Sequence, residues 1–519
     1  MTPPPVFPSA SDLIAWWARV APERVAIVDR TRGGRHTYAD LNASAERWAR
    51  VLLSLGVRRG DRVATLTGNR VEIVGLFFGA TRIGAVLVPL NWRLSVAELA
   101  RVIDDAAPAL IVGEDRHRSL GEAATKAAES AVQWLELDRE AAPLLAVSDA
   151  VGSVVWVSSE PEAPAMLLYT SGSTGKPKGA ILPHRQIYYN AVATTVGWQI
   201  GSNDVAIVAN PLFHTGGWHV FSTPLWHRGG TIVLFDQFDA TAFLDAIAEE
   251  RVTLAFGVPT QIVMMTQSAS WGRELPSLRF LISGGAPCPE ALGERVRAAG
   301  LRFRQGYGLT ECGPNCFAIT DEEAVRRPGA VGWASPFLEM RLVTEGAGNG
   351  EQGTETANPG ELLLRGPQMF GGYYNDPGRT AEAIDADGWL HTGDLATRDA
   401  DGAYRICGRK KDMFISGGEN VFPGEVEAAL SECPGIGEAV VVGVPDEKWG
   451  EVGRAFVVRR AGEDVSAEDV IAHARRRLAA YKVPKSVIVV DALPRLGSGK
   501  PDRAALESHS ITTLDPQRL

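Results

Sequence analysis

Short apolar runs with the length of buried strands alternate with segments of helical periodicity through the first four-fifths of the chain. The strand-like runs include residues 24–28, 61–66, 110–113, 204–209, 231–235, 253–256 and 279–283. The helical segments between them include residues 38–55, 95–104, 240–250 and 289–299. Strand–helix alternation requires crossover connections and parallel sheets that are covered on both faces. Roughly 300 residues of this pattern need two or more sheets, so the sequence predicts a large, layered α/β body.

The pattern changes after residue 360, where strands shorten and glycine-rich turns such as Gly371-Gly372-Tyr373-Tyr374 crowd together. Beyond residue 408 the expected order is helix 424–431, strand 438–444, strand 454–459, helix 467–480 and strand 486–490. This order is typical of a small α+β domain. We therefore expect a large domain over residues 1–408 and a small domain over residues 409–519. The charged run at 409–412 is interpreted as a linker, with a solvated turn as the alternative.

Composition narrows the class of protein. The 519 residues carry 52 Lys+Arg against 62 Asp+Glu, a formal net charge of −10, and 45% of them are hydrophobic. That hydrophobic content is ordinary for a globular protein, and the acidic balance argues against a general nucleic-acid binder, which needs a basic face. The 55 glycines are about 10.6% of the chain, above the usual ~7%, and indicate many tight turns or close approaches of backbone to a ligand.

The cysteines and the apolar stretches predict the cellular compartment of the protein. The five cysteines are odd in number and scattered, at positions 288, 312, 316, 407 and 433. No second Cys/His pair completes a zinc site with Cys312 and Cys316, so we expect reduced thiols in a cytoplasmic protein. The N-terminus shows neither a basic leader nor a long apolar run. The stretch from residue 71 to residue 90 is interrupted by Glu72 and Arg82, so we expect no membrane span.

The loop at residues 169–180, Tyr-Thr-Ser-Gly-Ser-Thr-Gly-Lys-Pro-Lys-Gly-Ala, carries the strongest chemical signal. Residues 170–179 hold four hydroxyl side chains, three glycines and two lysines, directly after the apolar run 165–168. Glycine lets backbone N–H groups converge on an oxygen cluster, while hydroxyls add donors and lysines add positive charge. The loop is therefore predicted to hold a polyphosphate.

Two familiar motifs fail on spacing in this loop. A Walker P-loop requires GxxxxGK[ST], but Thr170 stands at the first glycine position and Pro177 follows Lys176. The nucleophile elbow of a hydrolase requires GxSxG, but Ser171 stands two residues before Ser173. A flexible Ser/Gly surface linker is the remaining alternative, and the lysines and the preceding apolar run disfavour it.

The loop resembles the phosphate-binding signature of the adenylate-forming superfamily, and further motifs follow it in the order of that superfamily. They are Asn210-Pro-Leu-Phe-His-Thr-Gly-Gly217, Ser283-Gly-Gly-Ala-Pro287, Gly306-Tyr-Gly-Leu-Thr-Glu311, Trp389-Leu-His-Thr-Gly-Asp394, Gly408-Arg-Lys-Lys-Asp412, Ser416-Gly-Gly-Glu-Asn420 and Gly497-Ser-Gly-Lys500. With the upstream Val88-Pro-Leu-Asn91, the resemblance covers essentially the whole chain. It is strongest to the fatty acyl- and aryl-CoA ligases.

The resemblance implies a reaction in two halves. A carboxylate attacks the α-phosphate of ATP to give acyl-AMP and pyrophosphate, and the CoA thiol then displaces AMP to give a thioester. The expected substrates are a hydrophobic carboxylic acid, ATP (or acyl-AMP) and coenzyme A, with Mg²⁺ as the metal. The implied architecture is a large layered domain that includes a β-barrel-like part, followed by a small mobile domain.

Within the large domain, the resemblance assigns the nucleotide contacts. The phosphates would lie against Thr170, Ser171, Gly172, Ser173, Thr174, Gly175 and Lys176. Thr310 would contact the α-phosphate, and Glu311 would help to hold Mg²⁺, for which a carboxylate oxygen is a suitable hard ligand. The adenine would lie against Gly284, Gly285, Ala286, Tyr307 and Gly308. Asp394 would accept hydrogen bonds from the ribose hydroxyls, beside Arg409 as a donor.

The remaining assignments concern the second half of the reaction and the acid. Lys411 matches the hinge of the small domain, and Ser416, Gly417 and Gly418 match the segment that enters the site for thioester formation. His214 resembles the residue that gates the channel between acyl pocket and CoA tunnel, with a structural histidine as the alternative. Candidates for the pocket wall are His214, Trp218, Gly257, Ser283, Gly308 and Phe317, all residue types that are also common in an ordinary core.

The last motif departs from the usual pattern. Lys500 matches the catalytic lysine that bridges the substrate carboxylate and ATP, but Pro501 and Asp502 follow it. Pro501 restricts the backbone of Lys500 and removes one N–H, and Asp502 adds a nearby negative charge. A ligase impaired in adenylation that uses pre-formed acyl-AMP is therefore an alternative.

Three further alternatives stay open at the level of sequence. The acyl group could be loaded onto a carrier protein in place of CoA. The chain could be a non-catalytic nucleotide-binding protein, although it retains Lys176, Glu311, Asp394, Arg409 and Lys500. A monomer and a homodimer are both compatible with the sequence, which does not identify the carboxylic acid.

Overall fold

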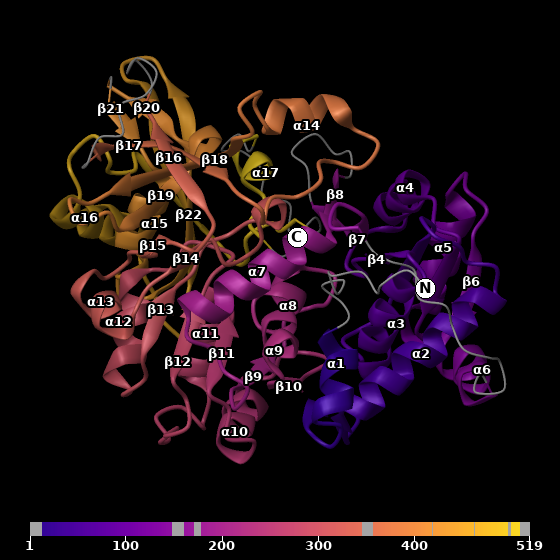
Figure 1. The fold of residues 1–519 in the computed structure, drawn as a ribbon. Coiled ribbons are helices and arrows are strands. Elements are labelled where there is room, and N and C mark those ends of the chain that lie inside the picture. The colour runs from indigo at the N-terminus through magenta and orange to yellow at the C-terminus, as the bar shows by residue number, and fades with distance from the viewer. Residues whose placement is uncertain are drawn as a thin grey trace.

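Two sheets of mostly parallel strands form the body of the protein (Figure 1). The computed structural model describes residues 13–147, 160–170, 178–344, 356–417, 419–460, 462–496 and 500–508. The first sheet has the order β6 (Gln133–Glu136), β5 (Leu110–Gly113), β3 (Arg62–Leu66), β4 (Val86–Pro89), β7 (Pro164–Thr170), β8 (Lys178–Pro183). Its strands are parallel except for the β7–β8 hairpin.

The second sheet supplies the floor of the site described below. It has the order β13 (Phe303–Gln305), β12 (Phe280–Ser283), β11 (Leu254–Gly257), β9 (Val205–Val208), β10 (Thr231–Leu234), β1 (Val25–Asp29), β2 (Arg35–Thr37). All pairs are parallel except β1 with β2. The expected strand–helix alternation is thus confirmed, with the strand ends displaced by one or two residues from the expected ranges.

Helices cover both faces of both sheets. They are α1 (Leu13–Val20), α2 (Tyr38–Ser54), α3 (Val71–Arg82), α4 (Val96–Ala106), α5 (Arg118–Ala127), α6 (Ala142–Val147), α7 (His184–Gly197), α8 (Thr215–His219), α9 (Ser222–Arg228), α10 (Ala240–Glu249), α11 (Pro259–Gln267) and α12 (Glu290–Ala298). The main hydrophobic core joins α2 and α3 to side chains from both sheets. A second cluster packs α10–α12 on the outer face of one sheet, and another packs α4 and α5 on the other.

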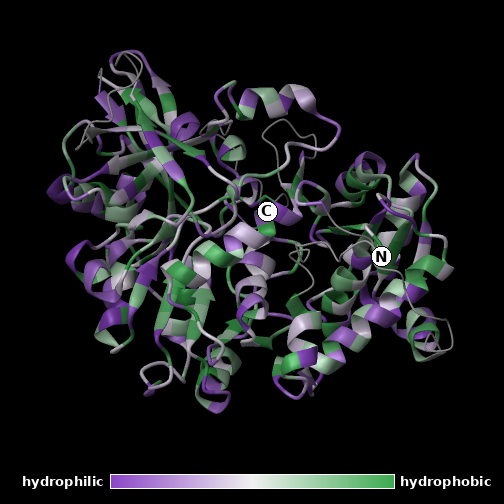
Figure 2. Ribbon diagram, viewed as in Figure 1, coloured by the Kyte–Doolittle hydropathy of each residue, from purple (hydrophilic) through white to green (hydrophobic). Residues whose placement is uncertain are grey.

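The alternation of side chains along a strand explains how one strand serves two cores. Val63 of β3 belongs to the core that contains α2 and α3, whereas Ala64 and Leu66 belong to the cluster beneath α4. Successive strand residues point to opposite faces, so a strand covered on both faces must be apolar throughout. Figure 2 shows the corresponding concentration of hydrophobic residues on the strands of the central sheets.

Helix α3 accounts for most of the apolar stretch between residues 71 and 90. Every residue of α3 except Glu72 is buried, because the helix lies in the core shared by the two sheets. The stretch then continues into β4. Within the described residues, no helix combines the length and the apolar character that crossing a membrane requires.

An antiparallel sheet follows the two parallel ones and corresponds to the part expected to resemble a β-barrel. Its order is β16 (Glu339–Val343), β17 (Thr356–Arg365), β18 (Leu390–Arg398), β19 (Tyr404–Arg409). A short ladder of β14 (Phe317–Ala318) and β15 (Trp333–Ala334) adjoins it through a bridge between Gly332 and Tyr404. Helices α13 (Asp321–Arg326) and α14 (Pro377–Ala383) lie in the connections.

The C-terminal part has a sheet and a core of its own, drawn in gold to yellow in Figure 1. Its strands are β20 (Phe414–Ser416), β21 (Glu419–Val421), β22 (Ile436–Asp446), β23 (Gly450–Arg459) and β24 (Ser486–Val490). Its helices are α15 (Pro423–Ser431), α16 (Ala467–Arg477) and α17 (Arg503–Glu507). Its two hydrophobic clusters draw their buried members from residues 414–506 alone. The fold is therefore a mixed α/β structure with a large N-terminal part and a small α+β C-terminal part.

Candidate active site

Loops that follow four neighbouring parallel strands gather at one edge of the second sheet. Strands β13, β12, β11 and β9 are adjacent. The carboxyl ends of parallel strands meet at the same edge, where ligands of open α/β sheets usually bind. The motifs at residues 210–217, 284–286 and 306–311 follow β9, β12 and β13, so this topology brings together segments that are far apart in the sequence.

The turn Thr310–Cys312, a single 3₁₀ turn, is held by three donors from distant segments. Its successive carbonyl oxygens accept hydrogen bonds from the Gln186 side chain (2.8 Å), the Phe370 backbone N–H (2.7 Å) and the Gln368 side chain (2.8 Å). Both glutamines are buried. Carbonyl groups at a helix end have no partner within the helix, so these three bonds fix a turn that would otherwise be mobile.

The carboxylate of Glu311, on this turn, is held by a hydrogen bond from a neutral side chain. Its Oε1 accepts a hydrogen bond of 2.7 Å from the Tyr373 hydroxyl. Among the described residues Glu311 forms no ion pair, and no group of three or more potential metal ligands is found. Mg²⁺ bound with ATP typically takes one or two protein carboxylates and substrate phosphates for the rest, so a single carboxylate of this kind fits that metal.

Asp394 lies beside Tyr307 with both carboxylate oxygens engaged. The Tyr307 hydroxyl donates to Oδ2 at 2.5 Å, and Nε of Arg409 lies 2.8 Å from Oδ1. Asp394 and Arg409 are direct partners in the β18–β19 ladder, which explains their proximity. Burial raises the pKa of Asp394, and the charge of Arg409 opposes that rise. A carboxylate has about four acceptor sites, so capacity for a ribose diol remains.

Lys500 lies close to this group although it belongs to the C-terminal part. Its pKa is lowered chiefly because the surrounding protein removes water from its amine, and also by the charge of Arg409, while Asp394 and Glu311 act in the opposite direction. The same ammonium helps to lower the pKa of His214. The charges of Arg409, Asp394 and Glu311 act on Lys500, and the charge of Lys500 acts on His214, so these residues share one electrostatic environment.

Pro501 fits its backbone without the loss of a hydrogen bond. It faces Arg495 in an antiparallel bridge that is closed by Leu496 N–H to Lys500 O and Asp502 N–H to Pro494 O, both at 2.8 Å. Neither bond needs an N–H at Pro501. The Asp502 side chain accepts the N–H of Ala505 and caps α17, so its carboxylate is engaged within the C-terminal part. Pro501 therefore costs this bridge no hydrogen bond.

His214 is the N-cap residue of α8 and stands beside an aromatic cluster. Its ring lies 4.7 Å from that of Phe213, which lies 5.9 Å from Trp92, itself stacked on His117 at 5.3 Å. Burial lowers the pKa of His214 to about 4, with further contributions from Arg93 and Lys500. His214 is therefore neutral at physiological pH.

The candidates for the acyl pocket occupy different environments. Trp218 is fully buried, packs at 5.0 Å against Phe77 and donates to the carbonyl of Leu212, which gives it a role in core packing. Phe317 is also buried and lies 5.7 Å from the Tyr307 ring. Ser283 is buried at the end of β12.

Phe256 is a further candidate for the wall of the acyl pocket, and the sequence analysis did not identify it. Its ring is half-buried, and methyl groups placed on Gly216 and Gly284 would approach it to 3.3 Å and 3.5 Å. On the other face of the strand, a methyl on Gly257 would meet Ile262 and Met265 of α11 at 3.2 Å. Phe256 therefore faces Gly216 and Gly284, whereas Gly257 packs toward α11.

Two glycines of the expected adenine contact are required for different reasons, one for its backbone conformation and the other for lack of space. Gly285 has φ +80°, in the left-handed region that disfavours other residues. Gly308 has no room for a side chain, because a methyl group there would lie 2.3 Å from the carbonyl carbon of Pro314. Gly285 and the adjacent Ala286 are exposed.

The phosphate loop is the connection of the β7–β8 hairpin, closed by the pair Thr170 and Lys178. Residues 171–177, which include the other expected phosphate contacts Ser171 to Lys176, lie outside the described residues. So does Gly418. Ser416 pairs with Glu419 and Gly450, and Gly417 donates to the carbonyl of Trp449 at 2.9 Å. Lys411 lies in a 3₁₀ turn, Lys410–Asp412, between β19 and β20.

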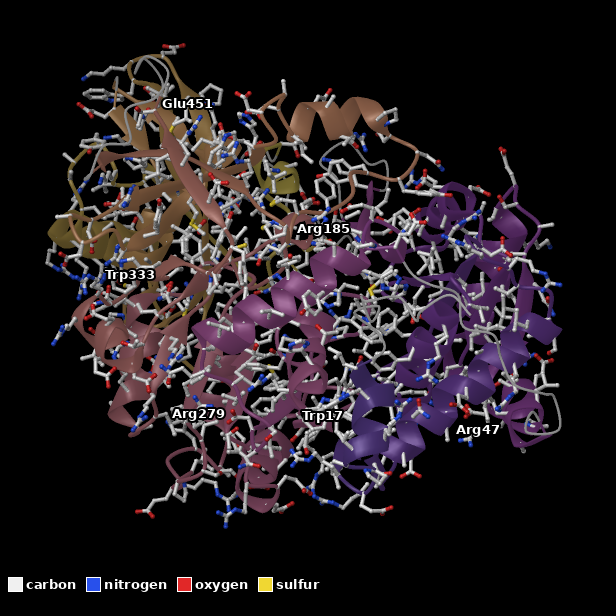
Figure 3. All side chains as sticks on the ribbon, in the orientation of Figure 1. Trp17, Arg47, Arg185, Arg279, Trp333 and Glu451 are labelled. Carbon is white, nitrogen blue, oxygen red and sulfur yellow. The ribbon has the colours of Figure 1, made fainter. Side chains whose placement is uncertain are left out.

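The sequence analysis did not identify four residues that the structure places at the candidate site: Gln186, Gln368, Tyr373 and Phe256. For Tyr373 a signal existed, since it lies in the glycine-rich turn noted above. The other three carry no local motif. Arg185, beside Gln186 on α7 and labelled in Figure 3, pairs with Glu162 and donates to the carbonyl of Met369. Helix α7 is thereby tied to the segment that carries Gln368.

Comparison with known proteins identifies the family of the chain. The family model described as "AMP-binding enzyme" matches residues 14–374, and "AMP-binding enzyme C-terminal domain" matches residues 425–500. The chain is 40% identical over 490 residues to a feruloyl-CoA synthase of an Amycolatopsis species, covering 93% of this chain and 95% of the relative. It is 36% identical over 512 residues to the long-chain-fatty-acid–CoA ligase FadD13 of Mycobacterium tuberculosis, covering 96% and 99%.

A solved structure shows the same fold. The o-succinylbenzoate CoA synthetase of Bacillus subtilis, in complex with its acyl-adenylate intermediate, superposes with a TM-score of 0.86 at 30% identity, covering 96% of this chain and 98% of that one. The family models, the relatives and the arrangement of Lys500, Glu311 and Asp394 agree. The chain therefore belongs to the AMP-binding enzyme family and, within it, to the AMP-forming acyl-CoA synthetases.

Proposed function

We propose that the chain makes the CoA thioester of a hydrophobic carboxylic acid through an acyl-AMP intermediate formed from ATP. The observation that carries this proposal is the convergence of Lys500 with Asp394, Arg409 and Glu311, because it unites a lysine of the C-terminal part with the nucleotide motifs. Such a site suits the joining of two anions, a carboxylate and a triphosphate, which depends on positive charge and positioning.

In the first half of the reaction, Lys500 would bridge the substrate carboxylate and the α-phosphate. At an effective dielectric of about 20, a unit charge ~4 Å from an oxyanion is worth roughly 4 kcal/mol, or about three orders of magnitude in rate. Thr310 would contact the α-phosphate, and residues 170–176 the remaining phosphates. Glu311 would hold the Mg²⁺ of ATP, which neutralises phosphate charge when bound. Asp394 would accept from the ribose, with Tyr307 against the adenine.

In the second half, the small domain would rotate about Lys411 and exchange Lys500 for the segment Ser416–Gly418. A boundary between residues 408 and 409 is consistent with the separate core of residues 414–506. The glycines let backbone pass close to the pantetheine arm. His214, neutral and flanked by Phe213, would gate the passage between acyl pocket and CoA tunnel.

The acid is proposed to be hydrophobic for two reasons. Phe256, with glycines on its flanks, offers an apolar surface beside the nucleotide site. Relatives that match along nearly the whole chain are named for feruloyl and long-chain acyl substrates, which share an apolar body behind the carboxylate.

The test is a pair of assays run side by side. Acid-dependent exchange of labelled pyrophosphate into ATP measures adenylation, and CoA thioester formation is measured from free acid and from synthetic acyl-AMP. Activity with a panel of aromatic and aliphatic acids is the expected result. The proposal fails if no acid supports either assay in the presence of ATP, Mg²⁺ and CoA.

The same assays separate the alternatives. Thioester formed from acyl-AMP without any pyrophosphate exchange identifies a thioesterification-only ligase. Exchange without CoA thioester, together with loading of a phosphopantetheinylated carrier protein, identifies a carrier-loading enzyme. Tight ATP binding without turnover identifies a non-catalytic nucleotide-binding protein. The ordinary geometry of Pro501 favours an enzyme that performs both halves.

A further inference from the structure

Tyr373 connects the strand that leaves the phosphate loop to the carboxylate of Glu311. Its hydroxyl donates to Oε1 of Glu311 at 2.7 Å. Its ring lies 5.4 Å from Nζ of Lys178, the first residue of β8. One side chain therefore contacts both the exit of the proposed phosphate-binding loop and the proposed metal ligand.

The backbone of the segment around Tyr373 is fixed to β8. Gly371 N–H donates to Ile181 O at 2.8 Å, Ile181 N–H donates to Gly372 O at 3.0 Å, and Tyr374 N–H donates to Gly179 O at 2.7 Å. Tyr373 itself bridges to Ala180. The segment thus extends the β7–β8 hairpin as an additional short strand, and it follows any movement of β8.

The side chain of Tyr373 has little freedom. Its ring packs at 5.0 Å against Phe370, whose N–H holds the carbonyl oxygen of Glu311. Because an ionised carboxylate can only accept, the phenol hydroxyl of Tyr373 is the donor in its contact with Glu311. Since a carboxylate can rotate about its last torsion, a fixed donor to one oxygen sets the direction of the other.

Glu311 Oε2 is the oxygen left for a cation. None of the described residues donates a hydrogen bond to it. Backbone and side chain of Glu311 are both held from the 370–373 segment, by Phe370 and Tyr373 respectively. That segment is in turn hydrogen-bonded to β8, so the carboxylate is held from this strand.

We propose that Tyr373 is a positioning residue that orients the Glu311 carboxylate toward the Mg²⁺ of ATP. This inference rests on the proposed function of Glu311 as a metal ligand. It assigns Tyr373 no contact with the reacting atoms. Its removal is expected to weaken metal binding in the ATP complex and to leave the metal-independent half of the reaction intact.

The substitution Tyr373→Phe removes the hydroxyl and keeps the ring beside Lys178. We expect the Mg²⁺ concentration for half-maximal acid-dependent pyrophosphate exchange to rise by roughly 3- to 30-fold, since a hydrogen bond to a charged acceptor is lost. A second readout is independent of turnover. Mn²⁺ bound in the presence of ATP, titrated by electron paramagnetic resonance, should show a matching loss of affinity. Thioester formation from synthetic acyl-AMP should stay within twofold of wild type.

Tyr374→Phe is the matched control, because Tyr374 is the adjacent residue and its ring lies near Arg62 instead of Glu311. It should leave the Mg²⁺ and Mn²⁺ dependences unchanged. An unchanged metal dependence in Tyr373→Phe overturns the inference. So does a parallel loss of the acyl-AMP reaction, which would mark Tyr373 as a purely structural residue. Failure of the wild-type protein to catalyse exchange would instead overturn the proposed function.

Discussion

The hydroxyl of Tyr307 donates a hydrogen bond of 2.5 Å to Oδ2 of Asp394, and these two residues belong to motifs 87 positions apart in the sequence. Tyr307 follows β13 of the parallel sheet, whereas Asp394 lies within β18 of the antiparallel sheet. The bond therefore ties together two architecturally separate parts of the large domain at the expected position of the nucleotide. It also connects the proposed adenine contact directly to the proposed ribose acceptor.

Substitution of Asp394 by asparagine should weaken nucleotide binding without destabilising the fold. Because burial raises the pKa of Asp394, its ionised form is disfavoured by folding at neutral pH, and an uncharged amide avoids that penalty. We expect the KM for ATP to rise about 10- to 100-fold, from the loss of charge-assisted hydrogen bonds. Steady-state kinetics and thermal unfolding at pH 7 measure both effects. A melting temperature well below wild type would contradict this account.

Substitution of Lys500 by methionine should separate the two halves of the reaction. The ammonium is the cation that the C-terminal part adds to the site, and its loss should slow pyrophosphate exchange about 100- to 1,000-fold. Thioester formation from synthetic acyl-AMP should remain within about threefold, because the proposed rearrangement withdraws this loop. Lys126→Met, an exposed lysine on α5, serves as the control. Equal loss of both half-reactions would contradict the assignment.

Substitution of Pro501 by alanine should have little effect on adenylation. The bridge between Arg495 and Pro501 is closed by the flanking Leu496 and Asp502 N–H groups, so a restored N–H at position 501 gains no partner in the ladder. We expect the rate of pyrophosphate exchange to change by less than about threefold, in either direction. An increase of tenfold or more would show that the proline restrains Lys500 and would support an enzyme impaired in adenylation.

Stability should decline steeply on mild acidification. Burial is the main cause that lowers the pKa of His184, His214 and His227 to about 4 and of His219 to about 3. The unfolded chain binds protons at these residues near pH 6.5, so the free energy of unfolding falls as pH drops below 6.5. The slope is at most about 1.4 kcal/mol per pH unit for each histidine. Urea unfolding at pH 5.0 and 7.5 measures the difference, and His219→Gln should reduce it.

Much of the fold followed from periodicity, and the exceptions have physical causes. The strands and helices that were named for the two parallel sheets lie within one or two residues of the observed bounds, because apolar runs and helical stripes mark them, whereas β2, β4, β6 and β13 had no expected counterpart. Helix α7 was missed, since it buries polar side chains such as Gln186, Asn190 and Thr194 and so lacks an amphipathic pattern. The hairpin of β20 and β21 was missed because each strand has three residues, too few to show alternation.

Only those site residues that belong to a local sequence motif could be predicted from the sequence. Lys500, Glu311, Asp394 and Arg409 stand in such motifs, and the fold brings them together. The contacts of Tyr373 with Glu311 and of Gln186 with the turn at 310 join residues 62 and 124 positions apart. No local pattern encodes such pairs, because they depend on how sheets and loops pack. For the same reason Trp218 was a reasonable wall candidate, and its core position became visible only in three dimensions.

The lowered pKa of Lys500 has a consequence for the small domain as a whole. Any rearrangement that withdraws Lys500 from this site ends the loss of hydration and the repulsion by Arg409 that lower its pKa, so the affinity of its amine for a proton rises. Withdrawal is thus an acid–base event as well as a mechanical one. By linkage, alkaline solution favours the engaged arrangement and acidic solution favours the withdrawn one. The pH of the solution thereby influences the orientation of the small domain through the protonation of one amine, that of Lys500.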